Sequence, residues 1–217
     1  MKGDYQFEHI GGTLDDAIGE CYDKVARVIG LGYPGGPKVE KAALEGEHTY
    51  DLPIPMNDDS FNMSFSGLKS NIINLVHNEK QRGNEIRNND LARSFQDVAI
   101  DQLCRKTELA IKKYDIKNMI IAGGVSANKY LRQEIKKVTD KYGVDLSVPS
   151  FVYCTDNAAM IGSQAYYEFL TGNTAGMELN AYATKVIQSD AIGMICGFFF
   201  SATRILRIFS FNQAPKA

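Results

Sequence analysis

Apolar residues recur every three or four positions in several stretches of the chain, which is the spacing of an amphipathic helix. The first such stretch follows Thr13, a candidate N-cap with acidic residues in the turn behind it, and predicts a helix over 14–30. A turn dense in Gly and Pro closes this helix. Further helices are predicted over 38–46, 68–80, 90–113, 127–143 and 156–170.

Shorter apolar runs predict the strands. Residues 61–65 alternate between apolar and polar side chains, which predicts a short strand with one apolar face. Residues 118–124 and 144–150 are typical of buried strands. Residues 47–60 are expected to form a loop because they hold two prolines and a run of Asn, Asp and Ser. Helices that alternate with strands in this order predict an α/β domain with helices packed on a sheet.

The composition fits a cytosolic globular protein without a strong electrostatic preference. The 24 basic and 26 acidic residues leave a net charge of −2, so any contact with RNA has to come from a local patch. The apolar run 191–211 meets Arg204 after about a dozen uncharged residues, too few to span a bilayer, and the first residues lack a secretory signal. Wide spacing without a CxxC pair indicates reduced thiols at Cys21, Cys104, Cys154 and Cys196.

Four loops interrupt the regular pattern with glycines or short polar side chains. Because ligands bind at loops beyond strand ends in open α/β folds, these loops are candidate walls of a pocket. Each loop also has a plainer explanation: close packing for the Gly-Gly pair, a helix N-cap for Asp156, and a solvated helix face for Asp23. The loops are Asp23 with 34–37, then 66–69, 123–128 and 154–157.

The loop at 123–128 carries the clearest chemical signal. An apolar strand runs into Gly123 and Gly124, and a basic amphipathic helix starts directly afterwards. Glycines let the backbone pass close to another group, and the first N–H groups of a helix attract anions. A phosphate or a nucleotide is therefore the first ligand expected here. The basic residues nearest to this pocket, and so the candidates for contact with RNA phosphates, are Lys69, Lys129 and Arg132.

Five segments occur in an order and at a spacing that carry a family resemblance. They are GGTLDDAIGECYDKVARVIGLGYPGGPKVEKAALEG, FNMSFSGLKSNI, LARSFQDVAIDQL, MIIAGGVSANKYLR and CTDNAAMIG. Together they resemble the carboxy-terminal lobe of the tRNA N6-adenosine threonylcarbamoyltransferase family, once classed as glycoprotein endopeptidases. The resemblance implies the actin, Hsp70 and sugar-kinase (ribonuclease H-like) fold, with a mixed sheet flanked by helices. It assigns 1–182 to this lobe and leaves 183–217 as an apolar tail of uncertain origin.

The resemblance implies a cytoplasmic enzyme that modifies tRNA. It transfers a threonylcarbamoyl group from threonylcarbamoyl-AMP, which is made from ATP, to N6 of the adenosine beside the anticodon in tRNAs that read codons beginning with A. The residues that match the family's contacts to this nucleotide are Asp23, Gly36, Glu40 and Asn128, together with the turn at Gly123 and Gly124. No catalytic residue is assigned. The implied partners are tRNA, a non-catalytic homologue of the same fold and a small ATPase.

The resemblance also implies a divalent metal, iron or zinc, with Asp156 as one ligand. A carboxylate suits such an ion, and the ion acts as a Lewis acid. The family's other ligands form an HxxxH pair in an amino-terminal lobe that is absent here, whereas the three histidines of this chain are isolated. With one ligand of three, we expect weak metal binding and a truncated form that is inactive alone.

Two other functions remain as alternatives. The first is a non-catalytic nucleotide-binding or dimerisation module of the same fold. An exposed phenylalanine-rich tail would favour such self-association, with Phe198, Phe199, Phe200, Phe209 and Phe211 as its apolar side chains. The second is a metallopeptidase, as the family's older classification suggests. The sequence contains no HExxH or similar zinc-peptidase pair that would support this function.

Overall fold

The computed structural model describes residues 8–180 and 209–210. The apolar tail predicted over 183–217, with its phenylalanines, therefore lies outside the described residues except for the backbone of 209–210.

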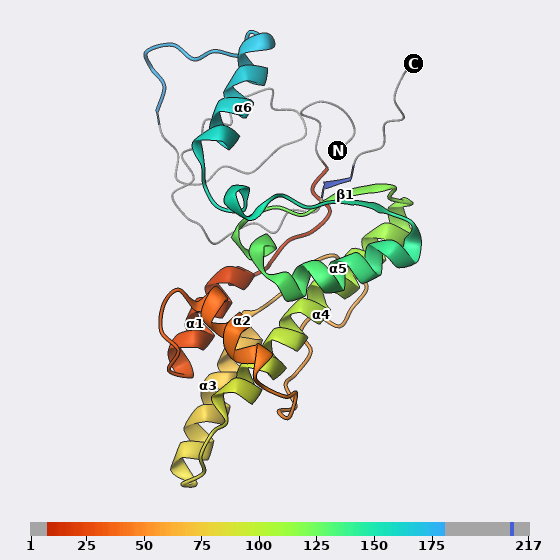
Figure 1. Cartoon of the computed structure of the whole chain (residues 1–217). Coiled ribbons are helices and arrows are strands. Elements are labelled where there is room, and N and C mark those ends of the chain that lie inside the picture. Colours follow the sequence, from red (N-terminus) through yellow and green to blue (C-terminus); the bar gives the residue numbers. More distant parts are fainter. Residues whose placement is uncertain (1–7, 181–208, 211–217) are drawn as a thin grey trace.

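Four helices form the larger part of the described fold: α1 (Ile18–Val28), α2 (Gly35–Leu44), α3 (Ser66–Gln81) and α4 (Asn88–Tyr114). The long helix α4 is central, because it packs against α2 and α5, while α1 packs against α2 and α3 (Figure 1). Tyr22 of α1 meets Phe95 of α4 edge to face, with ring centroids 4.9 Å apart.

Because α4 is surrounded, it buries both apolar and polar side chains along its length. Among the described residues, the largest fully buried side chains are Tyr22, Phe65, Leu68, Ile72, Leu91, Phe95, Ile100, Leu103, Met119, Ile121, Leu131 and Ile135. Most of them fall at the helical spacing seen in the sequence, which is why the helices were predictable.

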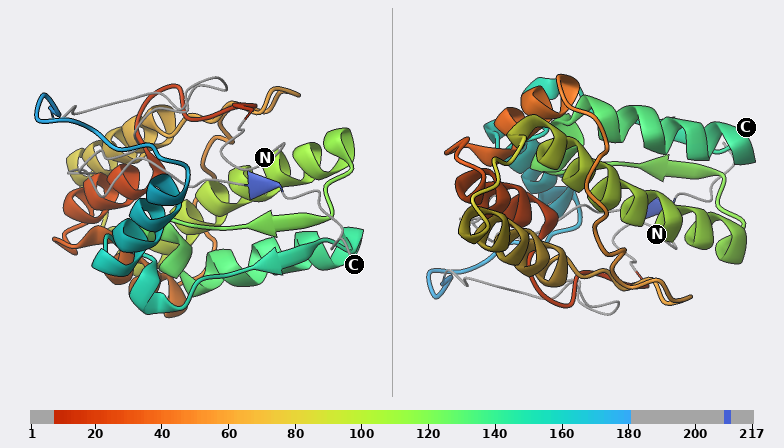
Figure 2. Two further views of the ribbon diagram at one scale, coloured as in Figure 1. Left: turned by 90° about the horizontal axis from the view of Figure 1, so that it is seen from above. Right: turned by 90° about the horizontal axis from the view of Figure 1, so that it is seen from below.

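The described sheet is small and mixed. Its strands are β1 (Asn118–Ile120), β2 (Asp145–Ser147) and β3 (Phe209–Ser210), in the order β2-β1-β3. β1 pairs with β2 in parallel and with β3 antiparallel. The parallel connection runs through η1 (Gly124–Ala127) and α5 (Lys129–Tyr142), and α4 and α5 lie on the same side of the sheet (Figure 2).

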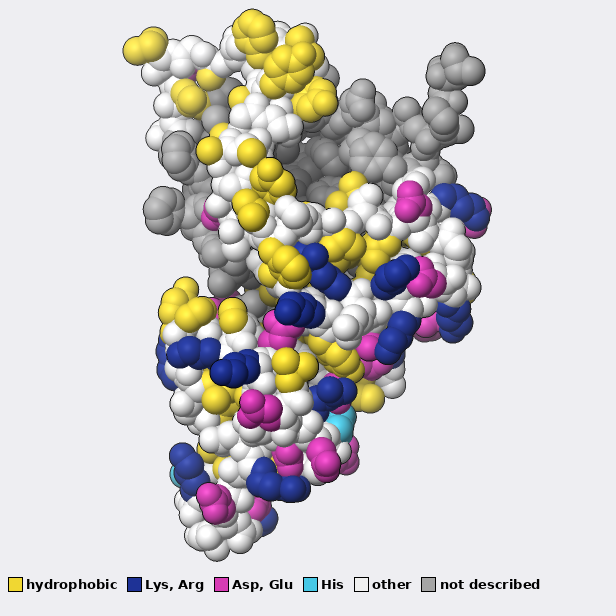
Figure 3. Space-filling view, viewed as in Figure 1, with side chains coloured by type: hydrophobic (Ala, Val, Ile, Leu, Met, Phe, Trp, Pro, Cys, Tyr) yellow, Lys and Arg dark blue, Asp and Glu magenta, His cyan; other side chains and the backbone are white. Residues whose placement is uncertain are grey.

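The last described helix differs from the others. After the turn η2 (Phe151–Tyr153), α6 (Ala158–Leu170) projects from the rest of the fold and contains no buried residue (Figure 1). Apolar side chains gather on the surface over η2 and α6 (Figure 3). The exposed large ones in this part are Phe151, Val152, Tyr153, Met160, Ile161, Tyr166, Tyr167, Phe169 and Leu170.

The predicted start of the first helix was wrong by four residues. The helix begins at Ile18 instead of residue 14, and its N-cap position is Ala17 with extended backbone, not Thr13. The reason is tertiary: the Asp15 side chain bonds to the start of α3, and Leu14 N–H donates to the Met63 carbonyl at 2.8 Å. These contacts bend the chain at residues 14–16, so that the helix begins only at residue 18.

The strand predicted over 61–65 was also wrong. The structure forms a single parallel bridge there, between Thr13 and Met63. The predicted strands 118–124 and 144–150 exist but are three residues long each. α2 begins at Gly35, three residues before the prediction, whereas α3, α4 and α5 agree with the predicted ranges within two residues.

Within residues 8–180 and 209–210, no helix combines the length and apolar character needed to cross a membrane.

Candidate functional site

Asp23 and Gly36, both predicted to contact a nucleotide, lie at one helix junction. The Asp23 Oδ1 atom accepts a hydrogen bond from the backbone N–H of Gly35 at 2.7 Å, which satisfies one free donor at the start of α2. The contact requires glycine, since a Cβ at Gly35 would lie 2.5 Å from the Asp23 Cα. A Cβ at Gly36 would meet nothing within 4 Å. The position of Gly36 therefore borders open space.

Glu40 connects this junction to the loop at 123–128. It lies one turn further along α2, and its Oε1 atom accepts a hydrogen bond from the backbone N–H of Lys129 at 2.7 Å. Lys129 is the first residue of α5 and follows Asn128 directly. Two hydrogen bonds to carboxylates thus join α1 to the start of α2, and α2 to the start of α5.

Asn128 is the N-cap of α5 and is almost fully buried, with 8% of its surface exposed. Its Oδ1 atom accepts from the backbone N–H of Leu131 at 2.8 Å, and its Nδ2 atom donates to Gln96 Oε1 on α4 at 3.1 Å. Gln96 was not singled out from the sequence. Its only signal there was a polar side chain directly after the apolar Phe95.

The Gly123-Gly124 turn does not lead directly into the helix as the sequence suggested. Gly123 has a φ of 90°, which favours glycine, and the short helix η1 separates it from α5. The Ser126 hydroxyl closes this turn by donating to the Gly123 carbonyl at 2.6 Å. Since Glu40 and Asn128 already accept from N–H groups at the start of α5, protein oxygens occupy part of the expected anion site.

The basic residues predicted near this turn differ in how far contacts within the protein engage their side chains. Arg132 donates to the Ser126 and Pro149 carbonyls and to Cys154 Sγ, so its guanidinium joins η1 to the loop after β2. Lys69 pairs with Asp16 at 2.6 Å. Lys129 is exposed at the start of α5. Of the three residues, Lys129 is the exposed one, whereas Lys69 and Arg132 are half-buried.

Asp156 lies in an exposed position between η2 and α6. The N-cap of α6 is its neighbour Asn157, whose Oδ1 atom accepts from the Met160 N–H at 2.9 Å. In the part of the chain that the structure describes, no three His, Cys, Asp or Glu side chains come close enough to hold a metal. Asp156 alone does not fit the iron or zinc site that the resemblance implies.

Asp15 and Asp16 have structural functions that sequence reasoning missed. Asp15 accepts from the N–H groups of Phe65 and Ser66 and from the hydroxyls of Ser64 and Ser66. Burial raises the pKa of Asp15, but these hydrogen bonds outweigh it and lower the pKa to about 2.

Asp16 binds two lysines, Lys69 at 2.6 Å and Lys24 at 2.9 Å. The hydrogen bond from Lys69 is the main reason that the pKa of Asp16 lies below its usual value. In the sequence, the only signal of this pair was two adjacent carboxylates, which suggested the first turn of a helix.

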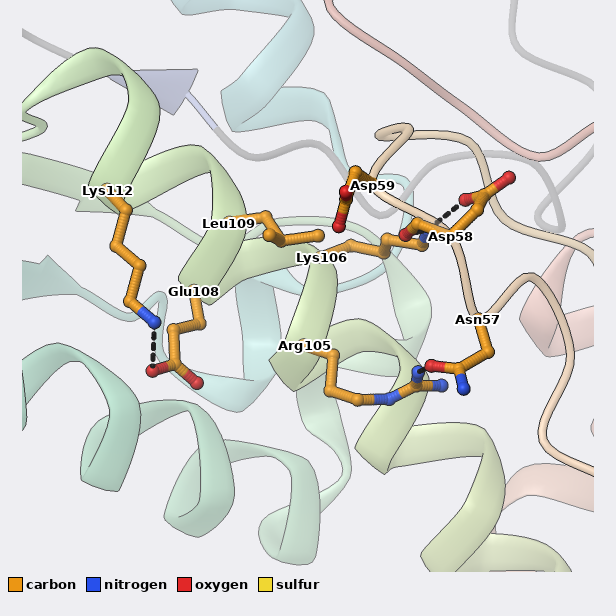
Figure 4. A pocket seen from close by; sticks show the side chains of 8 residues that line it. All are labelled: Asn57, Asp58, Asp59, Arg105, Lys106, Glu108, Leu109 and Lys112. Carbon is orange, nitrogen blue, oxygen red and sulfur yellow. Dashed lines mark hydrogen bonds and ion pairs between the residues drawn. The ribbon is translucent and has the colours of Figure 1, made fainter.

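A surface pocket of about 230 Å³ lies on the opposite half of α4, and none of the predicted ligand-binding residues lines it (Figure 4). Its charged groups largely satisfy one another. The ammonium group of Lys106, whose side chain is 3% exposed, donates to the Asp58 carboxylate and carbonyl and to the Ser60 carbonyl. The lining residues are Asn57, Asp58, Asp59, Arg105, Lys106, Glu108, Leu109 and Lys112.

Comparison with known proteins places these observations in a family context. A family model described as tRNA N6-adenosine threonylcarbamoyltransferase matches residues 1–163. A protein of that name from Staphylococcus carnosus is 48% identical over 193 residues, which cover 88% of this chain and 56% of the relative. Proteins of the same name from Staphylococcus saprophyticus and Halalkalibacterium halodurans are 49% and 47% identical with the same coverage. The chain spans about half the length of the curated relatives it matches.

Proposed function

Because the chain belongs to the tRNA N6-adenosine threonylcarbamoyltransferase family, we propose that it supplies the nucleotide-binding part of that enzyme. The substrate is threonylcarbamoyl-AMP, and the acceptor is N6 of the adenosine beside the anticodon in tRNAs that read codons beginning with A. In the transfer, N6 forms a bond to the carbamoyl carbon. The bond from this carbon to the phosphate oxygen breaks, AMP leaves with the electron pair, and N6 gives up one proton.

The observation that carries the proposal is the set of contacts among the residues that match the family's nucleotide contacts. Asp23 accepts a hydrogen bond from the start of α2, the helix that contains Gly36. Glu40 of α2 accepts one from the residue that follows Asn128. Four residues spread over about a hundred positions are therefore linked through two helix starts. Gly36, with open space around it, leaves room for a ribose or phosphate at this junction.

Calorimetric titration with ATP tests the binding half of the proposal. We expect binding by the unchanged chain and a loss of about tenfold or more in Asn128→Ala, because a buried polar contact to the ligand is removed. Lys136→Ala is a control, since Lys136 is exposed on α5 and pairs only with Asp140 among the described contacts. Equal affinity in Asn128→Ala and in the unchanged chain would remove Asn128 from the site.

A transfer assay tests the catalytic half. Unmodified tRNA is incubated with the chain, threonine, bicarbonate, ATP, a divalent metal and the enzyme that makes the adenylate, first with the chain alone and then with the partner proteins added. We expect nucleotide binding but no product from the chain alone, since Asp156 provides one carboxylate where the family's site requires further ligands. Product formation by the chain alone would show that binding and transfer reside in this part.

The proposed partners follow from the family and from the surface. They are tRNA, a non-catalytic homologue of the same fold and a small ATPase, and the proposed location is the cytoplasm. We assign Lys129 as the basic residue with the best access to a tRNA phosphate. A Lys129→Ala variant would then weaken tRNA binding and reduce its salt dependence without changing the affinity for ATP.

The second candidate function is a non-catalytic module that binds a nucleotide and associates through α6. The observation in its favour is the apolar surface over η2 and α6, which the described residues leave uncovered (Figure 3). Sedimentation at increasing protein concentration tests it. A chain that stays monomeric at high concentration would exclude association through this surface.

A further inference from the structure

Gln96 is a buried polar residue that the proposed function has not used. It lies in the middle of α4 with 1% of its surface exposed, directly after the core residue Phe95. Burying a carboxamide in an apolar environment costs free energy unless its polar atoms are hydrogen-bonded. The bond that its Oε1 atom accepts comes from Asn128, 32 residues away. The structure therefore connects the core of the fold to one predicted nucleotide contact.

The carboxamide of Asn128 is held at both ends. Its oxygen is identified by the capping bond from the Leu131 N–H, because a backbone N–H needs an acceptor. The nitrogen must then face Gln96, whose Oε1 atom is the acceptor at 3.1 Å. With the two bonds formed, the Asn128 side chain keeps one N–H and one oxygen lone pair for a further partner.

The backbone on either side of Asn128 is held in place by residues other than Gln96. Glu40 accepts from the Lys129 N–H, and Arg132 donates to the Ser126 carbonyl, so both flanks of Asn128 are fixed by other residues. What Gln96 adds is the orientation of one side chain. Without Gln96, the capping bond from Leu131 to Asn128 would remain, but the plane of the Asn128 carboxamide would no longer be fixed.

We propose that Gln96 is a positioning residue for nucleotide binding: it orients the Asn128 carboxamide so that the remaining N–H of Asn128 reaches a hydrogen-bond acceptor of the nucleotide. This inference rests on the proposed function, in which Asn128 contacts the adenylate. It goes beyond it by assigning a function to a residue in the core that does not touch the ligand.

The test compares the same substitution at two buried glutamines of α4. Gln96→Met removes the acceptor for Asn128 and keeps the side-chain length. Gln102→Met is the matched control: Gln102 is equally buried, but its Nε2 atom donates to the Pro55 carbonyl at 2.8 Å, on the loop 47–60. Both variants lose a buried hydrogen bond, but Gln102→Met also removes an Oε1 atom that is buried without a partner and should therefore lose less stability. Only Gln96→Met should lose affinity.

Calorimetric titration with ATP, at a temperature where each variant is folded, provides the readout. We expect about three- to tenfold weaker binding in Gln96→Met, unchanged binding in Gln102→Met, and recovery in Gln96→Glu, which restores an acceptor oxygen. In the double variant Gln96→Met with Asn128→Ala, binding should be no weaker than in Asn128→Ala alone, since the two residues act through one contact.

Two outcomes overturn the inference in distinguishable ways. If Asn128→Ala loses affinity while Gln96→Met keeps it, the proposed function stands and Gln96 has only a structural role. If the unchanged chain binds neither ATP nor a non-hydrolysable threonylcarbamoyl-AMP analogue, the proposed function fails and the inference fails with it. A measurement without ligand adds a check: the side-chain amide protons of Asn128 should exchange with solvent about tenfold faster in Gln96→Met than in Gln102→Met.

Discussion

The carboxylate of Glu40 accepts a hydrogen bond from the backbone N–H of Lys129 at 2.7 Å, although 89 positions separate the two residues. The bond joins the middle of α2 to the first residue of α5. It also places a negative charge at the positive end of the α5 dipole. Two stabilising effects therefore depend on one side chain.

Removing this side chain should destabilise the fold. We expect Glu40→Ala to lower the free energy of unfolding by about 1–2 kcal/mol, because α5 loses a capping bond and a favourable charge. Glu40→Gln keeps an acceptor oxygen and should lose about half as much. Urea unfolding measures both. Lys41→Ala, at an exposed neighbouring position, should stay within about 0.5 kcal/mol of the unchanged chain.

Acid should weaken the contact between Asp15 and the start of α3. The pKa of Asp15 is lowered from 3.8 to about 2, and such a carboxylate stabilises the fold above the unfolded pKa and loses this effect as the pH falls through the folded pKa. Asp15→Asn cannot ionise. We therefore expect its deficit in unfolding free energy to be constant above about pH 5 and to shrink between about pH 4 and pH 2. A deficit that is the same across this interval would contradict the low pKa.

Two adjacent glycines should respond to alanine with opposite signs. A methyl group at Gly35 would lie 2.5 Å from the Asp23 Cα, so Gly35→Ala should cost about 1–3 kcal/mol of stability. A methyl group at Gly36 would meet no other atom within 4 Å, and Gly36 lies inside α2, so Gly36→Ala should stabilise by up to about 1 kcal/mol.

Thermal unfolding measures both glycine variants, and calorimetry adds a second readout for one of them. If Gly36 borders the nucleotide, Gly36→Ala should bind ATP more weakly despite its higher stability. A Gly35→Ala variant as stable as the unchanged chain would show that the backbone at Gly35 can move away from Asp23.

The apolar surface of α6 should bind an apolar fluorescent dye. Ile161, Phe169 and Leu170 are 51%, 71% and 61% exposed, so replacing all three with Gln removes apolar surface without opening a cavity. We expect dye fluorescence to fall while the free energy of unfolding changes by less than about 0.5 kcal/mol per position. Leu14→Gln, at an exposed site outside α6, is the control. Unchanged fluorescence would indicate that α6 is covered in solution.

The long helices were predictable from the sequence because their apolar spacing is local. α3, α4 and α5 bury residues at helical spacing, and Gly143 ends α5 in the left-handed conformation that its residue type favours. The start of α1 was not predictable in this way. Its position depends on Asp15, whose partners lie some fifty residues further along the chain.

In the candidate site, too, local features could be predicted from the sequence and tertiary contacts could not. The glycines and carboxylates of its loops could be selected from the sequence because each interrupts a regular pattern, and the family resemblance gave them an order. That Asp23 and Glu40 bond to helix starts, and that Asn128 meets Gln96, could not be predicted, since these contacts join segments through the fold. Gln96 carries no local signal that distinguishes it from Gln102.

Lys106 shows how this packing controls reactivity. Three acceptor oxygens lie within 2.8 Å of its ammonium nitrogen, and the side chain is nearly inaccessible. An amine that is packed and hydrogen-bonded in this way cannot be reached by an acylating reagent until those contacts open. In a lysine-footprinting experiment, Lys106 should therefore remain unacylated for as long as the loop 57–60 stays on α4, and its labelling rate would report the opening of that loop.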